Sequence, residues 1–251
     1  MADRMRVLEG GAGSPLLVLL HGLGGTADVW DGWRPHLAER WPGRWLAPDL
    51  PGHGGSAPLP HYSFGALAAA VAEVVAPAAA DGADTVVLGH SLGGVVGLAL
   101  GSGWFGVPVR TVVGLGIKVS WTSDELARAR ALADRPAQDF PTRDDAARRH
   151  LRVSGLAGLV DPDGPAVDGG LRRHSDGWRL ALDPRAFGVG APDLPGLLAA
   201  CRARTVLARG ETDPMVTAEQ LPDGLTLPGL GHNAHVEDPD AVLALLDRRS
   251  G

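Results

Sequence analysis

One hexapeptide, Gly89-His90-Ser91-Leu92-Gly93-Gly94, constrains this chain more strongly than any other feature of its sequence. It follows the largely apolar run 85–88 and leads directly into the apolar run 95–100. A strand, a sharp turn with one serine between glycines, and a helix form the pattern of a nucleophile elbow. The glycines are needed there because side chains two positions either side of the serine would collide with the neighbouring strand and helix. The pattern predicts that Ser91 is an attacking oxygen and that the chain is an enzyme.

The rest of the chain alternates between short apolar runs and helical stretches. The apolar runs are continuous rather than interspersed with polar residues, as expected for strands that are covered on both faces. Such strands alternating with helices predict an α/β fold, with a mostly parallel central sheet flanked by helices on both sides. The predicted strands cover 15–20, 45–48, 85–88, 109–115, 205–208 and 224–227, and the predicted helices 27–41, 63–80, 91–101, 193–202 and 238–249.

One long segment, 119–191, interrupts this alternation because it contains no convincing core strand. Polar, amphipathic patterns predict helices over 122–135 and 142–153, and a long insertion in a compact domain is usually functional. We therefore expect 1–118 and 192–251 to form the core domain. Residues 119–191 are expected to form a helical cap inserted late in the chain.

Side chains in and beside the cap are candidates for contact with substrate. Trp121, Phe140 and Trp178 would line an apolar acyl site, and the alternative is ordinary packing within the cap. Lys118 follows the predicted strand that ends near Gly116. We expect Lys118 at the surface, and the alternative is a position in the cleft, where it would meet an anionic substrate.

A serine hydroxyl is a poor nucleophile, so it needs a base, and the base needs an orienting carboxylate. Ligands of open α/β sheets collect beyond the carboxyl ends of the strands, where these partners are expected. Asp213 stands in a turn after the predicted strand 205–208, with Glu211 as the rival carboxylate. His232 follows a glycine-rich loop after the next predicted strand, and the order Ser91, Asp213, His232 is the one expected for a genuine elbow. The alternatives are a helix-capping role for Asp213 and a structural role for His232.

The glycine-rich turn His21-Gly22-Leu23-Gly24-Gly25 follows the first predicted core strand. Its glycines let the backbone approach the elbow, so that the N–H groups of Leu23 and Leu92 can form an oxyanion hole. The same turn fits a dinucleotide-binding pattern, with Asp49 at the next strand end. That alternative is not favoured, because it leaves the elbow and its two partners without a role. The histidines match no zinc-binding spacing either, so we expect neither a cofactor nor a metal.

Composition sets the broad class of the protein. With 251 residues, 45% of them hydrophobic and 21% charged, the chain can bury one sizeable core. Its net charge of −6 argues against nucleic-acid binding. The charged start at 1–7 lacks the apolar core of a signal peptide, and no run approaches the roughly 18 apolar residues of a membrane span. We expect a cytoplasmic bacterial protein, a monomer or homodimer, that acts on a small molecule and binds neither nucleic acid nor membrane.

Five motifs in this order resemble the α/β-hydrolase superfamily, and the resemblance covers nearly all of the chain outside the cap. It implies that Ser91 is the nucleophile, that His232 is its base and that Asp213 orients the histidine. It also implies that the backbone N–H groups of Leu23 and Leu92 bind the oxyanion. The motifs are His21-Gly22-Leu23-Gly24-Gly25, Asp49-Leu50-Pro51-Gly52-His53-Gly54-Gly55-Ser56, Gly89-His90-Ser91-Leu92-Gly93-Gly94, Gly210-Glu211-Thr212-Asp213 and Gly231-His232-Asn233-Ala234-His235-Val236-Glu237-Asp238-Pro239.

The resemblance implies a serine hydrolase that cleaves a small carboxylic ester, a lactone or a thioester through an acyl-enzyme on Ser91. Similar folds with the same triad cleave carbon–carbon bonds or amides, although the carbon–carbon hydrolases usually carry an aromatic residue where this chain has Asn233. Other relatives are ligand-binding or accessory proteins with little turnover. The family's amino-terminal antiparallel strands look truncated, because only 4–9 remains as a candidate strand.

Overall fold

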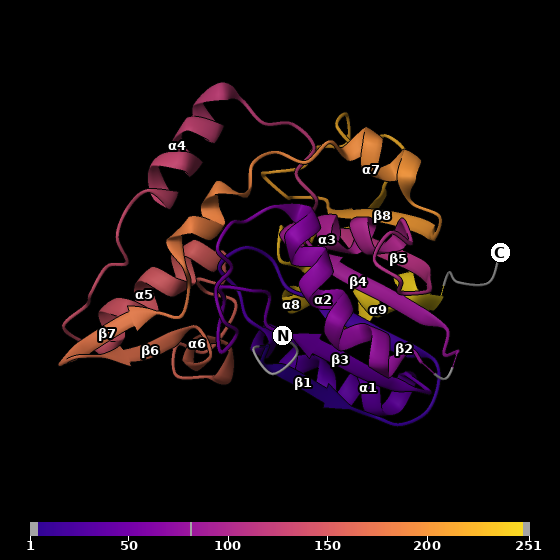
Figure 1. Ribbon diagram of the computed structural model, residues 1–251, viewed down its shortest axis with the longest axis horizontal. Helices are drawn as coiled ribbons and strands as arrows, with labels where there is room; N and C mark the ends of the chain where they lie inside the picture. The colour runs from indigo at the N-terminus through magenta and orange to yellow at the C-terminus, as the bar shows by residue number, and fades with distance from the viewer. Residues whose placement is uncertain (1–4, 81, 248–251) are drawn as a thin grey trace.

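A seven-stranded sheet forms the centre of the computed structural model, which describes residues 5–80 and 82–247 (Figure 1). Its first strand pairs antiparallel with its neighbour, and the other neighbouring strands run parallel. This arrangement confirms the predicted mostly parallel sheet. In spatial order the strands are β1 (Val7–Gly10), β3 (Arg44–Pro48), β2 (Leu16–Leu20), β4 (Thr85–His90), β5 (Val109–Leu115), β8 (Arg204–Gly210) and β9 (Leu225–Leu227).

Helices cover both faces of the sheet and form two separate apolar cores (Figure 1). One face packs against α2 (Phe64–Ala78), α3 (Leu92–Gly101) and α7 (Leu194–Ala200). The other packs against the 3-10 helix η2 (Ala27–Trp33), α1 (Arg34–Arg40), α8 (Ala234–Glu237) and α9 (Pro239–Asp247).

Strand β2 shows why the predicted strands are continuously apolar. Leu17 and Leu19 join one core, whereas Leu16, Val18 and Leu20 join the other. Successive side chains of a strand point to opposite faces, so a strand covered twice needs apolar residues at every position. All five of these side chains are fully buried. Each contributes about 1.5–3 kcal/mol of hydrophobic stabilisation relative to an exposed position.

Some predicted elements differ in their bounds. The predicted helix 27–41 is two helices, because Pro35 lies at the start of α1, where a proline favours a new helix and interrupts an existing one. The predicted strand 4–9 is β1, which begins at Val7, and Arg4 lies outside the described residues. The last helix ends at Asp247 within the described part of the chain, and the two further predicted residues lie beyond it.

Between β5 and α7 the chain leaves the sheet and forms a separate layer beside it (Figure 1). This segment contains an antiparallel hairpin, so the expectation of a purely helical cap is incomplete. The sequence pattern did not predict the two strands of this hairpin. Ser175 has a φ of 50°, which lets a two-residue loop reverse the chain. The elements are α4 (Ser123–Ala133), α5 (Arg143–Ser154), α6 (Pro165–Asp168), β6 (Leu171–His174), β7 (Gly177–Leu180) and η3 (Pro184–Val189).

The cap boundaries 119 and 191 stay a proposal. No helix in the part of the chain that the structure describes is long and apolar enough to cross a membrane. The cytoplasmic location and the oligomeric state remain expectations.

Candidate active site

Ser91 occupies a sharp, strained turn between β4 and α3. Its φ of 49° and ψ of −113° are rare for a residue other than glycine, and such a conformation costs about 1–3 kcal/mol. The Ser91 N–H donates to the Leu115 carbonyl at 2.8 Å, so β5 holds the turn in place. A Cβ on Gly89 would lie 2.2 Å from the Gly93 oxygen, and a Cβ on Gly93 would lie 2.3 Å from the Leu20 oxygen. Both distances are collisions with backbone, which agrees with the predicted reason for the glycines.

Asp213 and His232 meet beyond the carboxyl ends of β8 and β9. The His232 Nδ1 lies 2.9 Å from the Asp213 Oδ2, and the Asp213 side chain is fully buried. The other carboxylate oxygen of Asp213 accepts the Met215 N–H at 2.8 Å, so this residue both caps the following turn and faces the histidine. Glu211 is exposed and accepts the Gly229 N–H instead. The geometry therefore favours Asp213 over its rival as the partner of His232.

Ser91 and His232 line the same cavity, whose volume is about 430 Å³. Within the described residues no hydrogen bond joins the two side chains. Hydrogen bonds of catalytic groups are often long or poorly aligned before substrate binds and tighten in the complex. The structure thus brings Asp213 and His232 into direct contact and places Ser91 on the wall of the same cavity as His232.

The two predicted oxyanion donors, Leu23 and Leu92, come from two different segments that border Ser91. Leu92 is the first residue of α3, so its N–H has no acceptor within the helix. Leu23 lies in the turn after β2, which is closed by a hydrogen bond from the Gly25 N–H to the Gly22 carbonyl at 3.1 Å. A Cβ on Gly22 would lie 3.4 Å from the Ser91 Cβ, so this turn approaches the elbow closely. Both leucines line the cavity.

Asp49, which the dinucleotide-binding pattern requires, is fully buried and already bonded. Its carboxylate accepts the N–H groups of Ala27 at 2.6 Å and Gly55 at 2.8 Å, and it pairs with Arg6 at 3.2 Å. The carboxylate therefore fixes the loop after β3 and has no face left for a ribose. Among the described residues, no group of three or more histidine, cysteine, aspartate or glutamate side chains is placed to hold a metal ion.

His90 has a supporting role that the sequence did not reveal. Its Nε2–H donates to the His232 carbonyl at 3.0 Å, and its ring centroid lies 4.7 Å from the His232 ring and 4.3 Å from the His235 ring. Burial lowers the pKa of His90 well below its ordinary value, so the ring is neutral and donates through one nitrogen. His90 thereby connects the elbow to the loop that carries His232. No local pattern could indicate this contact, because 142 residues separate the two histidines.

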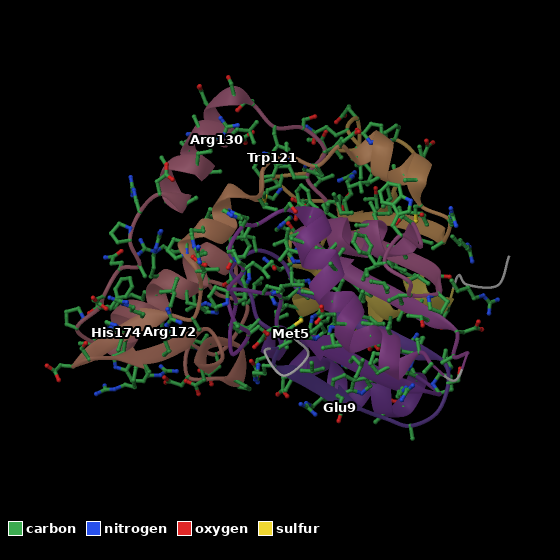
Figure 2. The ribbon with its side chains drawn as sticks, in the orientation of Figure 1. Met5, Glu9, Trp121, Arg130, Arg172 and His174 are labelled. Carbon is green, nitrogen blue, oxygen red and sulfur yellow. The ribbon has the colours of Figure 1, made fainter. Side chains whose placement is uncertain are left out.

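The cavity wall includes only one of the three aromatic residues predicted to contact substrate. Trp121 lines the cavity, on the connection that leads from the sheet to α4 (Figure 2). Phe140 and Trp178 are not on it, because their side chains pack with the apolar core instead. Their backbones pair with each other, with N–H to O distances of 2.8 and 2.9 Å. Phe187 from η3 lines the cavity as well. Lys118 also lines the cavity and its side chain is 15% exposed, so its expected surface position is wrong.

The fold and this site define an α/β protein with a serine, a histidine and an aspartate gathered at the carboxyl edge of a parallel sheet. The family model described as "Alpha/beta hydrolase family" matches residues 17–245. The chain therefore belongs to the alpha/beta hydrolase family, which confirms the resemblance found in its motifs. Membership of this family supports the prediction of a hydrolase enzyme.

Two curated relatives and two solved structures illustrate the similarity. The magnesium-chelatase 30 kDa subunit of Rhodobacter capsulatus is 31% identical over 68% of this chain, and the match spans 65% of that relative, slightly less than two thirds of its length. The pimeloyl-[acyl-carrier protein] methyl ester esterase of Methylococcus capsulatus is 30% identical over 67% of this chain and 71% of that protein. The structure of E-2-(acetamidomethylene)succinate hydrolase superposes with a TM-score of 0.78 at 20% identity, covering 97% and 94% of the two chains. An esterase from Mycobacterium tuberculosis has a TM-score of 0.74 at 25% identity, covering 99% and 88%.

Proposed function

We propose that the protein is a serine hydrolase that cleaves a small carboxylic ester, or a related lactone or thioester, through an acyl-enzyme. The observation that carries this proposal is the Asp213–His232 hydrogen bond of 2.9 Å at the wall of the cavity that Ser91 also lines. A serine on a positive-φ elbow, a histidine and a buried carboxylate are the three parts that nucleophilic catalysis of acyl transfer needs. The esterases among the relatives support the same reaction class.

The reaction begins when the Ser91 Oγ attacks the carbonyl carbon of the ester and His232 Nε2 takes the hydroxyl proton. The Asp213 carboxylate accepts the Nδ1–H and stabilises the imidazolium that forms. The tetrahedral oxyanion is held by the N–H groups of Leu23 and Leu92. The ester C–O bond then breaks, and the alcohol leaves with the proton from His232. Water attacks the acyl carbon by the same route, which releases the acid and returns the proton to Ser91.

The cap supplies the apolar wall of the proposed substrate site. None of the residues of α4 is buried, although Leu126 and Leu132 line the cavity with Val153 of α5. An apolar helix face that finds no protein core is covered when an acyl chain fills the cavity. We therefore propose a small-molecule substrate with an apolar part that contacts these side chains and Trp121.

Labelling with a fluorophosphonate tests the proposal, because only an activated serine reacts with it. We expect labelling at Ser91 and turnover of p-nitrophenyl butyrate. Ser91→Ala removes both while thermal unfolding shows that the variant is folded, and the rate falls by about 10⁴–10⁶. Ser120→Ala, an exposed serine outside the cavity, is the matched control.

Three outcomes separate the candidate functions. Retention of a tenth or more of the activity in Ser91→Ala would remove the assignment. Labelling without ester turnover would point to cleavage of an amide or a carbon–carbon bond by the same triad. Absence of labelling would point to a ligand-binding or accessory role.

A further inference from the structure

The charged side chains on the cavity wall are unbalanced. Lys118, Arg128 and Arg152 line the cavity among its described residues, whereas Glu125 is the one carboxylate there. The protein as a whole has a net charge of −6. The cavity wall therefore carries an excess of positive charge, although the protein as a whole is negatively charged.

Lys118 and Glu125 neutralise each other. The Lys118 Nζ lies 2.6 Å from the Glu125 carboxylate, and the Lys118 ammonium also lies 5.1 Å from the centre of the Trp121 ring. The hydrogen bond from Lys118 and the Thr122 N–H lower the pKa of Glu125 to about 2, so the carboxylate stays ionised and the pair stays neutral. The excess positive charge therefore belongs to the two arginines.

Arg128 and Arg152 form no ion pair within the described residues, and they come from the two cap helices that border the cavity. The Nε of each bonds to a carbonyl of its own helix, that of Asp124 or Arg148, at 3.3 Å. This bond leaves the two terminal nitrogens of each guanidinium without a partner in the described structure.

Some arginines of the cap form ion pairs with aspartates, and others, such as Arg130 and Arg149, form none among the described residues. On α5, Arg143 pairs with Asp163 and Asp168 at 2.7 Å, and Arg148 pairs with Asp145 at 2.6 Å. Arg128 and Arg152 share the lack of an ion pair with Arg130 and Arg149, and they differ from them in lining this cavity.

We propose that the cavity takes an ester that carries a carboxylate at a distance from the scissile bond, and that Arg128 and Arg152 bind this carboxylate. The planar guanidinium matches a carboxylate in a bidentate geometry, and a charge-assisted hydrogen bond is stronger than a neutral one. The apolar residues Leu126, Leu132 and Val153, which line the cavity, contact the carbon chain of the substrate between its ester and its carboxylate. This inference rests on the proposed function, because the same site supplies the reaction.

The test compares methyl hydrogen adipate with methyl hexanoate, which have the same chain length and differ in the terminal carboxylate. We expect kcat/KM for the charged ester to exceed that for the neutral ester by about tenfold or more at low salt. Arg128→Gln/Arg152→Gln lowers this ratio about tenfold. Arg130→Gln, on α4 but outside the cavity wall, keeps the ratio (Figure 2). Two residues along a helix amount to about 200° of rotation, so Arg130 points away from Arg128.

A binding measurement distinguishes a failure of the proposed carboxylate site from a failure of the proposed ester hydrolysis. Calorimetry with Ser91→Ala needs no turnover, and we expect methyl hydrogen adipate to bind at least tenfold more tightly than methyl hexanoate. If neither ester is hydrolysed but this difference is present, the carboxylate site stands and the ester hydrolase proposal fails. Equal binding of the two esters, or an unchanged ratio in the double variant, overturns the carboxylate site whether or not the protein is an esterase.

Discussion

The elbow around Ser91 and the cap helix α4 line one cavity, yet different interactions hold them in place. Every residue of α3, which follows the elbow, is buried, and a Cβ added at Gly89 or Gly93 would collide with backbone atoms. Helix α4 has no buried residue. It is held at its start by a capping box between Thr122 and Glu125 and by the Lys118–Glu125 ion pair.

The elbow and the cap therefore differ in how much change in sequence they tolerate. The proposed chemistry depends on backbone geometry that tolerates almost no change, because a Cβ at the elbow meets main-chain atoms. The proposed specificity depends on exposed or half-buried side chains of the cap, which can change at little cost to stability. The core should therefore respond to substitution with large losses of activity or stability, and the cap with modest changes in substrate preference.

The strongest test of the core is Asp213→Asn. We expect the rate of p-nitrophenyl butyrate hydrolysis to fall by about 10⁴, because an amide cannot stabilise the imidazolium or hold its tautomer as the carboxylate does. Glu211→Gln is the control, since that exposed carboxylate bonds to the Gly229 N–H, and its rate should stay within about threefold. Equal losses in both variants would contradict the choice of Asp213.

The backbone contact of the elbow is tested by Gly93→Ala. The new Cβ would lie 2.3 Å from the Leu20 oxygen, and we expect the free energy of unfolding in urea to fall by about 3 kcal/mol or more. Gly65→Ala provides the comparison, because that glycine in α2 has open space around its Cβ position. It should raise stability by up to about 1 kcal/mol. Similar stabilities of the two variants would show that the elbow is less constrained than its geometry indicates.

The buried histidines of the core predict that acid destabilises the protein. Burial lowers the pKa of His21 to about 4 and that of His235 to about 3. Between these values and the ordinary value near 6.5, the unfolded chain binds protons that the folded chain does not. The contribution of the neutral His21 and His235 side chains to the free energy of unfolding is therefore complete above pH 6.5. It is lost as the pH falls toward 4, by up to about 1.4 kcal/mol per pH unit for each histidine.

Urea unfolding between pH 7 and pH 5 measures this slope. His235→Phe should reduce the slope by up to about 1.4 kcal/mol per pH unit, because one titrating group is removed. His61→Gln, at an exposed position, should leave it unchanged. A slope that does not differ between His235→Phe and the parent would show that His235 is not neutral in the folded protein.

The smallest effect is expected in the cap. Leu126→Ala should lower kcat/KM for a six-carbon acyl ester about three- to tenfold and change the free energy of unfolding by about 0.5 kcal/mol or less. The matching truncation in the core, Leu98→Ala, removes a fully buried side chain and should cost about 2–5 kcal/mol. A comparable loss of stability in the two variants would mean that α4 belongs to the core rather than to a separate layer.

The sequence by itself determined the parallel sheet, the elbow and the strand ends that carry Asp213 and His232. These features are local, because continuous apolar runs, glycines around a serine and polar residues after a strand are all visible in short windows. The topology rule that parallel strands present their carboxyl ends at one edge then brings separate motifs together. The family resemblance rests on five such local motifs, and the family model that matches residues 17–245 confirmed it.

Only the tertiary structure decided which side chains surround the cavity. Trp121 lines it while Phe140 and Trp178 do not, although the sequence offered the three aromatic residues as equal candidates. Lys118 lines it as well, although the sequence placed it at the surface. The contact of His90 with the His232 carbonyl joins residues far apart in the chain. Such contacts depend on how one element is placed against another, which side-chain packing settles after the local structure has formed. The sequence therefore predicted the proposed reaction centre, and the packing of the cap determined the cavity wall that would select its substrate.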